Sequence, residues 1–109
     1  MLREARALIA QGWTRGTRRR QYKRAPTGYS YCVLGAVDAV PSTLAAQEAA
    51  TRALNEVLAR DYQVEKYDRF GGAYKHTPGI PTFNDRMAKS KKDVLVLFDK
   101  AIALTTGGK

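Results

Sequence analysis

The chain has 109 residues, of which 44% are hydrophobic, a length and composition that predict one ordered domain and exclude two domains or global disorder. No apolar run approaches the ~20 residues of a membrane span, and the N-terminus begins in a charged amphipathic pattern without a signal-peptide core. The single cysteine excludes an internal disulfide and a cysteine-rich zinc site. We therefore expect a soluble cytoplasmic protein.

Charge is the most unusual feature of the composition. The chain carries 19 Lys and Arg against 10 Asp and Glu, for a formal net charge of +9. No acidic residue lies between Ala5 and Val37, and that stretch contains the whole of an arginine-rich block, residues 15–24. Such a segment attracts polyanions, and its interactions weaken as salt is added.

The first predicted helix runs from Leu2 to Gln11, where apolar residues recur at helical spacing. Gly12 is expected to end it, and Trp13 to pack back against it as an anchor. Residues 14–30 show no period and are interrupted by glycine and proline. We therefore expect a long basic loop there.

The second predicted helix covers residues 31–40, with Ser30 as its N-cap and a proline immediately after it. Its sequence is apolar nearly all round, which predicts a buried, central helix. A third and longest helix is expected to begin at Ser42 or Thr43 and to end near Tyr62. Its apolar residues recur on one face, and charged residues occupy the other.

Residues 63–89 are rich in glycine and proline and predict a long irregular connection. Short strands at residues 64–67 or 73–76 are alternatives within it. The aromatic side chains of this segment suggest that it packs on the core; they are Tyr67, Phe70, Tyr74 and Phe83. A last helix should run from a Ser90 cap to about residue 105, ended by Gly107 and Gly108, with a frayed tail over residues 106–109.

These elements predict a mainly α fold in a single domain of residues 1–109. It would be a compact bundle of about four helices with the second helix at its centre. A long basic loop would project from it, and a long irregular connection would precede the last helix.

The arginine-rich block predicts contact with a polyanion. Guanidinium groups bind phosphates in bidentate fashion, and tyrosines can stack on unpaired bases. A solvated loop, or a loop that binds an acidic protein surface, would carry the same charge. The candidate binding residues are Arg15, Arg18, Arg19, Arg20, Tyr22, Lys23 and Arg24, with a second basic cluster at Lys89, Lys91 and Lys92.

A thiol enzyme is a weaker hypothesis. Cys32 falls in the first predicted turn of the second helix, where free N–H groups favour a thiolate. His76 and then Asp85 follow it along the chain, the order found in papain-like enzymes. A cysteine in an apolar helix is more commonly a small core residue, and Asn84 with Asp85 more commonly caps a helix than binds a metal. We expect no enzyme activity, no metal and no cofactor.

Four short blocks follow one another along the chain: ALIAQGW at 7–13, YCVLGA at 31–36, IPTFND at 80–85 and DVLVLFDKAI at 93–102. Together they resemble a family of small proteins of unknown function that are found in actinobacteria and in phages that infect them. The resemblance covers most of the chain. It implies a helical fold and an origin, but no activity.

The resemblance also implies which residues are the family's signature: Trp13, Cys32, Gly35, Ala36, Asn84, Asp85 and Ile102. The chain departs from the usual pattern at Tyr31 and Phe83, where the family commonly has Trp. The arginine-rich insertion and the loop at 71–79 are peculiar to this member, and His76 matches no motif of the family. We interpret Gly35 as a site of close approach by another helix, and Asn84 with Asp85 as a buried polar clasp that caps a neighbouring element.

Three functions remain open. The leading hypothesis is a non-enzymatic accessory protein, encoded by a phage, that binds nucleic acid or a nucleoprotein by phosphate neutralisation through residues 15–24. The second is an inhibitor of a host or defence factor that has an acidic surface. The third is a thiol enzyme built on Cys32. The sequence leaves the oligomeric state open.

Overall fold

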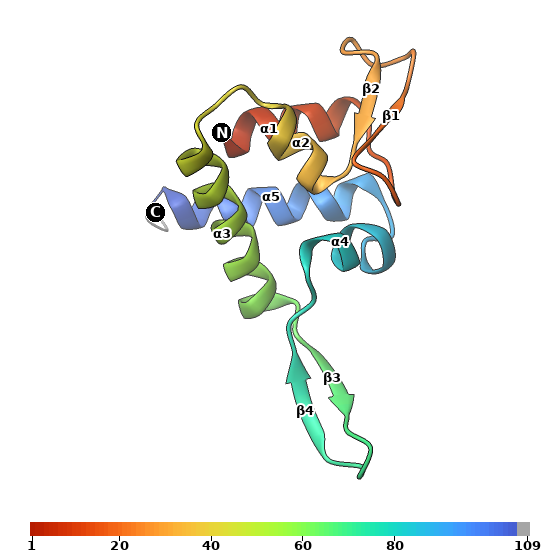
Figure 1. Cartoon of the computed structure of the whole chain (residues 1–109), viewed down its shortest axis with the longest axis vertical. Coiled ribbons are helices and arrows are strands. Elements are labelled where there is room, and N and C mark those ends of the chain that lie inside the picture. Colours follow the sequence, from red (N-terminus) through yellow and green to blue (C-terminus); the bar gives the residue numbers. More distant parts are fainter. Residues whose placement is uncertain (107–109) are drawn as a thin grey trace.

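The computed structural model describes residues 1–106 and shows an α+β fold (Figure 1). Helices make up most of it, and two small antiparallel sheets accompany them. The elements in chain order are α1 (Leu2–Gln11), β1 (Arg19–Gln21), β2 (Tyr29–Tyr31), α2 (Val33–Ala39), α3 (Leu44–Asp61), β3 (Val64–Tyr67), β4 (Ala73–His76), the short α4 (Ile80–Thr82), the π-helix η1 (Phe83–Met87) and α5 (Lys91–Thr105).

The predicted four-helix bundle is therefore wrong, because both segments expected to be irregular contain paired strands. The predicted basic loop, residues 14–30, contains β1 and the start of β2. These strands pair in the register Arg19↔Tyr31, Arg20↔Ser30 and Gln21↔Tyr29. The exposed polar residues of β1 show no alternation of apolar and polar side chains, and so they carry no strand pattern.

The second hairpin corrects the predicted irregular connection of residues 63–89. Strands were expected at 64–67 or at 73–76; both form, and they pair with each other from Val64↔His76 to Tyr67↔Ala73. This hairpin projects from the body of the molecule (Figure 1). Residues 80–87 of the segment form α4 and η1.

The predicted boundaries of the long helices are confirmed. Helix α1 covers the expected residues, and α3 begins after Thr43, whose hydroxyl accepts an N–H of its first turn. Helix α5 begins after Ser90, but that side chain makes no capping bond; Asp93 instead accepts the backbone N–H of Lys89 at 2.8 Å. The predicted stop at the two glycines near the C-terminus lies outside the described residues, as does the expected tail beyond Thr106.

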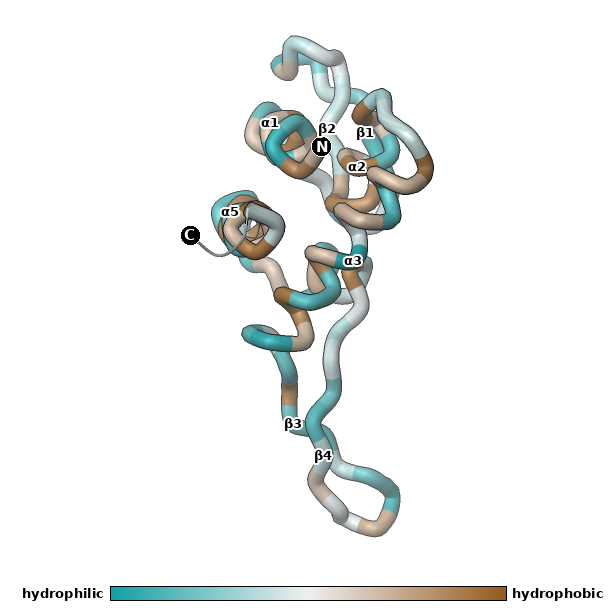
Figure 2. Tube along the Cα trace, turned by 90° about the vertical axis from the view of Figure 1, so that its left-hand side faces the viewer, coloured by the Kyte–Doolittle hydropathy of each residue, from teal (hydrophilic) through white to brown (hydrophobic). Residues whose placement is uncertain are grey.

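The hydrophobic core lies between the helices. The short α2 is buried, as predicted, and packs against α1, α3 and α4. Helix α5 packs against both α1 and α3 and shares the core with α2 (Figure 1). Figure 2 shows brown, hydrophobic segments recurring along α1, α2 and α5. The largest fully buried apolar side chains are Ile9, Val33, Val37, Leu54, Val57, Leu58, Val94, Leu97 and Phe98.

The start of α2 differs from the prediction because β2 occupies residues expected to precede or begin the helix. Ser30 lies in β2 and does not cap α2. Cys32 is the N-cap, and its Sγ accepts the backbone N–H of Gly35 at 3.3 Å. Strand β2 thus leads directly into the buried helix α2 without an intervening turn.

Gly35 is a site of close approach, but the neighbour is not a helix. A Cβ placed on Gly35 would overlap the carbonyl oxygen of Arg18, just before β1. The same carbonyl accepts the backbone N–H of Cys32 at 3.0 Å. The absence of a side chain at Gly35 therefore lets the chain entering β1 lie directly on the first turn of α2.

No helix within residues 1–106 is both long enough and apolar enough to cross a membrane.

We predict that Gly35→Ala lowers the free energy of unfolding by about 1–3 kcal/mol, because backbone must move to admit the methyl group. Urea denaturation followed by circular dichroism measures the change. The control is Gly79→Ala, where the nearest atom to an added Cβ is Pro81 Cδ at 3.8 Å. Equal stability of the two variants would contradict the proposed close approach.

Candidate functional site

The side chain of Asn84 joins three segments that lie far apart in the sequence. Asn84 is 1% exposed. Its Oδ1 accepts from the indole Nε1 of Trp13 at 2.9 Å and from the backbone N of Val33 at 3.1 Å. Its Nδ2 donates to the carbonyl oxygen of Thr14 at 3.0 Å and to Asp85 Oδ1 at 2.8 Å. Both hydrogens and both lone pairs of the amide are thus used.

This geometry agrees with the interpretation of Asn84 and Asp85 as a polar clasp. Val33 is the first residue of α2, so Asn84 caps that helix from a distant element. The bond to Trp13 fixes the indole just beyond the end of α1. The π-helical turn η1 places Asn84 and Asp85 in succession toward these neighbours, and it closes with a bond from Ala88 N to the carbonyl of Phe83 at 2.9 Å.

Asp85 extends the network to the chain that enters β1. Its Oδ1 accepts the backbone N–H of Gly16 at 2.9 Å. This hydrogen bond is the main cause that lowers the pKa of Asp85; the bond from Asn84 and the positive charges of Arg15 and Arg86 lower it further. Asp85 is therefore held as a carboxylate, and it fixes Gly16, whose φ of 76° suits glycine.

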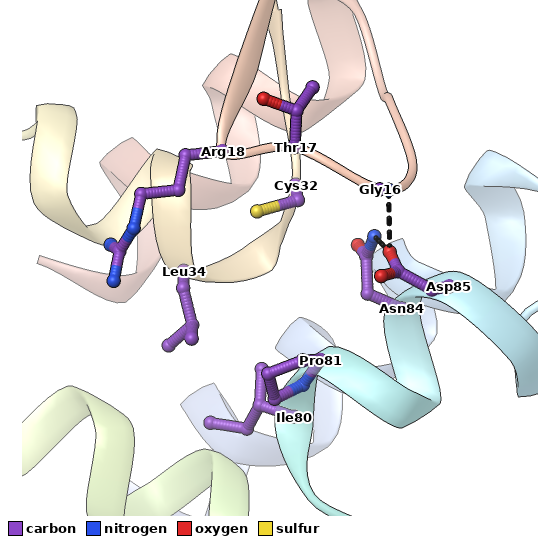
Figure 3. Close-up of a pocket in the computed structure, with 9 residues that line it drawn as sticks. All are labelled: Gly16, Thr17, Arg18, Cys32, Leu34, Ile80, Pro81, Asn84 and Asp85. Atoms are coloured by element: carbon purple, nitrogen blue, oxygen red, sulfur yellow. Dashed lines mark hydrogen bonds between the residues drawn. The ribbon is translucent and has the colours of Figure 1, made fainter.

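A cavity of about 230 Å³ lies beside this network (Figure 3). Cys32 from one block of the sequence and Asn84 and Asp85 from another line it, together with Thr17 and Arg18. His76 is not among the lining residues. It lies in β4, paired with Val64. The structure thus brings two of the three thiol-enzyme candidates to one cavity and places the histidine in the projecting hairpin. Within residues 1–106, no group of three or more His, Cys, Asp or Glu side chains could hold a metal ion.

Part of the arginine-rich block supports the fold. Arg15 donates to the carbonyl oxygen of Ala88, and its guanidinium lies 4.7 Å from the centre of the Trp13 ring. Arg18 forms an ion pair with Asp38 of α2. These two arginines hold the base of the β1–β2 hairpin against η1 and α2.

Arg19 is also engaged, since its guanidinium lies 4.4 Å from the centre of the Tyr29 ring across the hairpin. That ring belongs to β2, the partner strand. The contact is a cation–π interaction on the surface of the hairpin. It leaves the charge of Arg19 available to an incoming anion while limiting the movement of its side chain.

The outer part of the hairpin carries the remaining candidates. Arg20, Lys23 and Arg24 are exposed, and in the described part of the chain none of them makes an ion pair or a side-chain hydrogen bond. Tyr22 beside them is 38% exposed. The turn that presents them is ordered by backbone bonds, including Tyr22 N to the carbonyl of Gly28 at 2.8 Å.

The second basic cluster lies near the base of the hairpin. Lys91 donates from Nζ to the carbonyl oxygen of Ala10 at 2.9 Å and so caps the end of α1. Lys89 and Lys92 are exposed. Because Arg15 bonds to the carbonyl of Ala88, Lys89 directly follows a residue that the arginine-rich block contacts.

The comparisons with known proteins identify a family. The model of a family of unknown function, DUF6197, matches residues 1–104. The chain belongs to this family. The predicted membership of a family of unknown function is thus confirmed, and the family's description names no activity. No curated protein matches the chain, and no solved structure matches it.

The aromatic side chains of residues 63–89 divide into two groups in this DUF6197 protein. Phe83 is 2% exposed and packs edge-on against Tyr62, with the ring centres 5.0 Å apart. Tyr67, Phe70 and Tyr74 are exposed on the β3–β4 hairpin. The expectation that all four pack on the core was wrong, because that hairpin projects beyond the core (Figure 1). Sequence reasoning thus missed an exposed aromatic surface.

We predict that Asn84→Ala lowers the free energy of unfolding by roughly 3 kcal/mol or more. The substitution leaves the Trp13 indole, the Val33 N–H and the Thr14 carbonyl without their partner, and each unpaired buried group costs about 1–3 kcal/mol. Urea denaturation measures the loss. Asn55→Ala on the exposed side of α3 is the matched control and should change stability by less than about 0.5 kcal/mol. An Asn84→Ala protein as stable as wild type would show that the network contributes little.

Proposed function

We propose that this DUF6197 protein is a non-enzymatic accessory protein that binds nucleic acid or a nucleoprotein through the β1–β2 hairpin. One observation carries the proposal: Arg20, Lys23 and Arg24 are exposed and unpaired, in residues 1–106, on an ordered hairpin. Phosphate groups are the ligands that such side chains bind best. Binding would neutralise phosphates and release counterions.

The local charge supports a polyanionic partner. No acidic residue occurs between β1 and β2 or within them. At the base of the hairpin, Asp38 is paired with Arg18, and Asp85 accepts hydrogen bonds from Gly16 and Asn84. Within residues 1–106, neither carboxylate forms an ion pair with Arg20, Lys23 or Arg24, so the outer hairpin keeps its positive charge. The formal net charge of +9 adds long-range attraction.

The defined structure of the β1–β2 hairpin also supports the proposal. Its base is fixed by Arg15, Arg18 and Asp85, so the outer cations are held on a scaffold before any partner arrives. A preorganised surface loses less conformational entropy on binding than a free loop does. The exposed cations are not arranged to form specific hydrogen bonds with base edges. We therefore propose contacts to the phosphate backbone and little sequence preference.

The other hypotheses have less support. A thiol enzyme needs a base beside Cys32, and His76 does not line the cavity that Cys32 faces. An inhibitor that binds an acidic protein would use the same cations and is distinguished by the experiment below. An origin in actinobacteria or their phages, and a location in the cytoplasm of such a host, are parts of the same proposal; the four sequence blocks support them.

We predict that the triple variant Arg20→Ala, Lys23→Ala, Arg24→Ala binds DNA and RNA more weakly and with a flatter salt dependence. Removal of three phosphate contacts should reduce the slope of log K against log salt by about 2–3 for duplex DNA. Fluorescence anisotropy with labelled oligonucleotides from ~50 to ~200 mM salt measures both quantities. Arg18 is left intact because its ion pair with Asp38 belongs to the fold.

Two control variants test whether binding depends on the position of the cations or on the total charge of the protein. The variant Arg3→Ala, Arg52→Ala, Arg86→Ala removes three exposed cations elsewhere and should retain most of the affinity. The charge-preserving variant Arg20→Lys, Lys23→Arg, Arg24→Lys should bind nearly as wild type. Equal losses in both triple alanine variants would overturn the assignment to the hairpin. Absence of wild-type binding at ~50 mM salt would reject nucleic acid and favour an acidic protein partner.

A further inference from the structure

The β3–β4 hairpin with its flanking residues, here called the arm (residues 63–77), is a second projection of the molecule. It lies at the end of the long axis opposite the β1–β2 hairpin, as Figures 1 and 2 both show. No helix of residues 1–106 covers it, and nearly all of its residues are exposed. A two-stranded hairpin without a covering layer is only marginally stable. Its exposed surface is therefore a candidate for binding a partner.

The tip of the arm holds an apolar ring in water. Phe70 is 89% exposed. Asp68 orders the turn around it, because its Oδ1 accepts the backbone N–H groups of Phe70 and Gly72, each at 2.8 Å. A further bond joins the backbone N of Asp68 to the carbonyl of Gly72 at 2.8 Å. The exposure of Phe70 is thus a property of an ordered turn.

Two more aromatic side chains lie on the strands. Tyr67 is 65% exposed and Tyr74 is 47% exposed. The register pairs Lys66 with Tyr74 and Tyr67 with Ala73. Since adjacent pairs of a hairpin point to opposite faces, the two tyrosines lie on opposite faces of the arm. The arm therefore presents a ring on each face and a third ring at its tip.

Cations accompany the rings. Lys66 is the cross-strand partner of Tyr74, and the Arg69 guanidinium lies 5.7 Å from the centre of the Phe70 ring. Lys75 is exposed on the strand beside Tyr74. The arm also holds two carboxylates: Asp68 accepts hydrogen bonds within the turn, and Glu65, the cross-strand partner of Lys75, accepts from the hydroxyl of Tyr67 at 2.7 Å. Three cations against two carboxylates leave the arm with a formal net charge of +1 beside its exposed aromatic rings.

We propose that the arm binds nucleic acid at unpaired bases. Phe70, Tyr67 and Tyr74 would stack on bases, and Lys66, Arg69 and Lys75 would contact phosphates. Every base has a face on which an aromatic ring can stack, so this mode requires no particular sequence. Rings on both faces and at the tip suit insertion between separated strands or bases, as apolar wedges do. The proposal rests on the proposed function and names its substrate class: single-stranded or locally opened nucleic acid.

The geometry disfavours the other partners. A second copy of the chain would bring the same cations together, and like charges repel. A flat lipid surface would meet rings on only one face of the arm. The molecule is 50 Å long, which corresponds to about 15 base pairs of duplex. One nucleic acid of moderate length can therefore reach both hairpins, the β1–β2 hairpin on its backbone and the arm at an opened segment.

The test compares wild type with Phe70→Ala and with Tyr67→Ala, Phe70→Ala, Tyr74→Ala. Ligands are a labelled 30-nucleotide single strand, its duplex, and the same duplex with a central mismatched bubble, at ~100 mM salt. A 2-aminopurine in the unpaired segment reports stacking by quenching. We expect wild type to favour the unpaired ligands, and Phe70→Ala to lose roughly 5- to 150-fold in affinity for them, with the quenching reduced. Affinity for the plain duplex should be unchanged.

Leu44→Ala is the control, because Leu44 is an apolar side chain 71% exposed at the start of α3, outside the arm. It should bind all ligands as wild type does. Phe70→Trp retains a stacking ring and should restore both the affinity and the quenching. That rescue excludes a merely misfolded arm as the cause of the loss.

Three outcomes overturn the inference. Equal affinity of wild type and the arm variants for single strands overturns it while leaving the proposed function intact, provided that the Arg20, Lys23, Arg24 variant still loses binding. Absence of binding to any nucleic acid overturns both. Sedimentation with anionic vesicles that Phe70→Ala abolishes, without a change in 2-aminopurine quenching, assigns the arm to a lipid surface instead.

Discussion

The side-chain amide of Asn84 is the interaction on which the arrangement of the N-terminal half depends. Helix α2 has seven residues and is too short to be stable by itself. Two N–H groups of its first turn are satisfied by side chains, that of Val33 by Asn84 and that of Gly35 by its N-cap Cys32. The same amide holds Trp13 and Thr14. One buried, fully bonded group therefore fixes the end of α1, the start of α2 and the turn η1 relative to one another.

This hydrogen-bond network also fixes the position of the β1–β2 hairpin. Strand β2 leads directly into α2, and the chain entering β1 is held by Asp85 at Gly16 and by the bond from Cys32 to the carbonyl of Arg18. The arginine-rich block therefore has two roles. Its first members anchor the hairpin, and its later members, Arg20 onward, extend into water. The arginines cannot be distinguished by their charge. Their contacts in the fold show which of them support the hairpin and which are free to bind a partner.

The sequence predicted the helices well because their apolar residues repeat over several turns, as in α1 and α3. It did not predict β1, whose exposed polar residues carry no periodic signal. It also could not tell engaged from free arginines, since the partner of Arg15 lies 73 residues away and that of Arg18 lies 20 away. Asn84 was interpreted as a clasp from the family resemblance, but its partners are set by tertiary packing. Phe70 was expected to pack together with the other aromatic residues of its segment; the length of the arm carries it past the core.

Binding through the two projecting hairpins is tested most directly by titration of ¹⁵N-labelled protein with a 30-nucleotide single strand, followed by amide chemical shifts. We expect shifts concentrated at residues 20–24 of the β1–β2 hairpin and at Phe70 and Gly71 of the arm, with the exposed face of α3 around Asn55 unaffected. The shifts at residues 20–24 should diminish as salt is raised. Shifts confined to α3 or to the cavity beside Cys32, with both hairpins unchanged, would contradict the assignment of binding to the projecting hairpins.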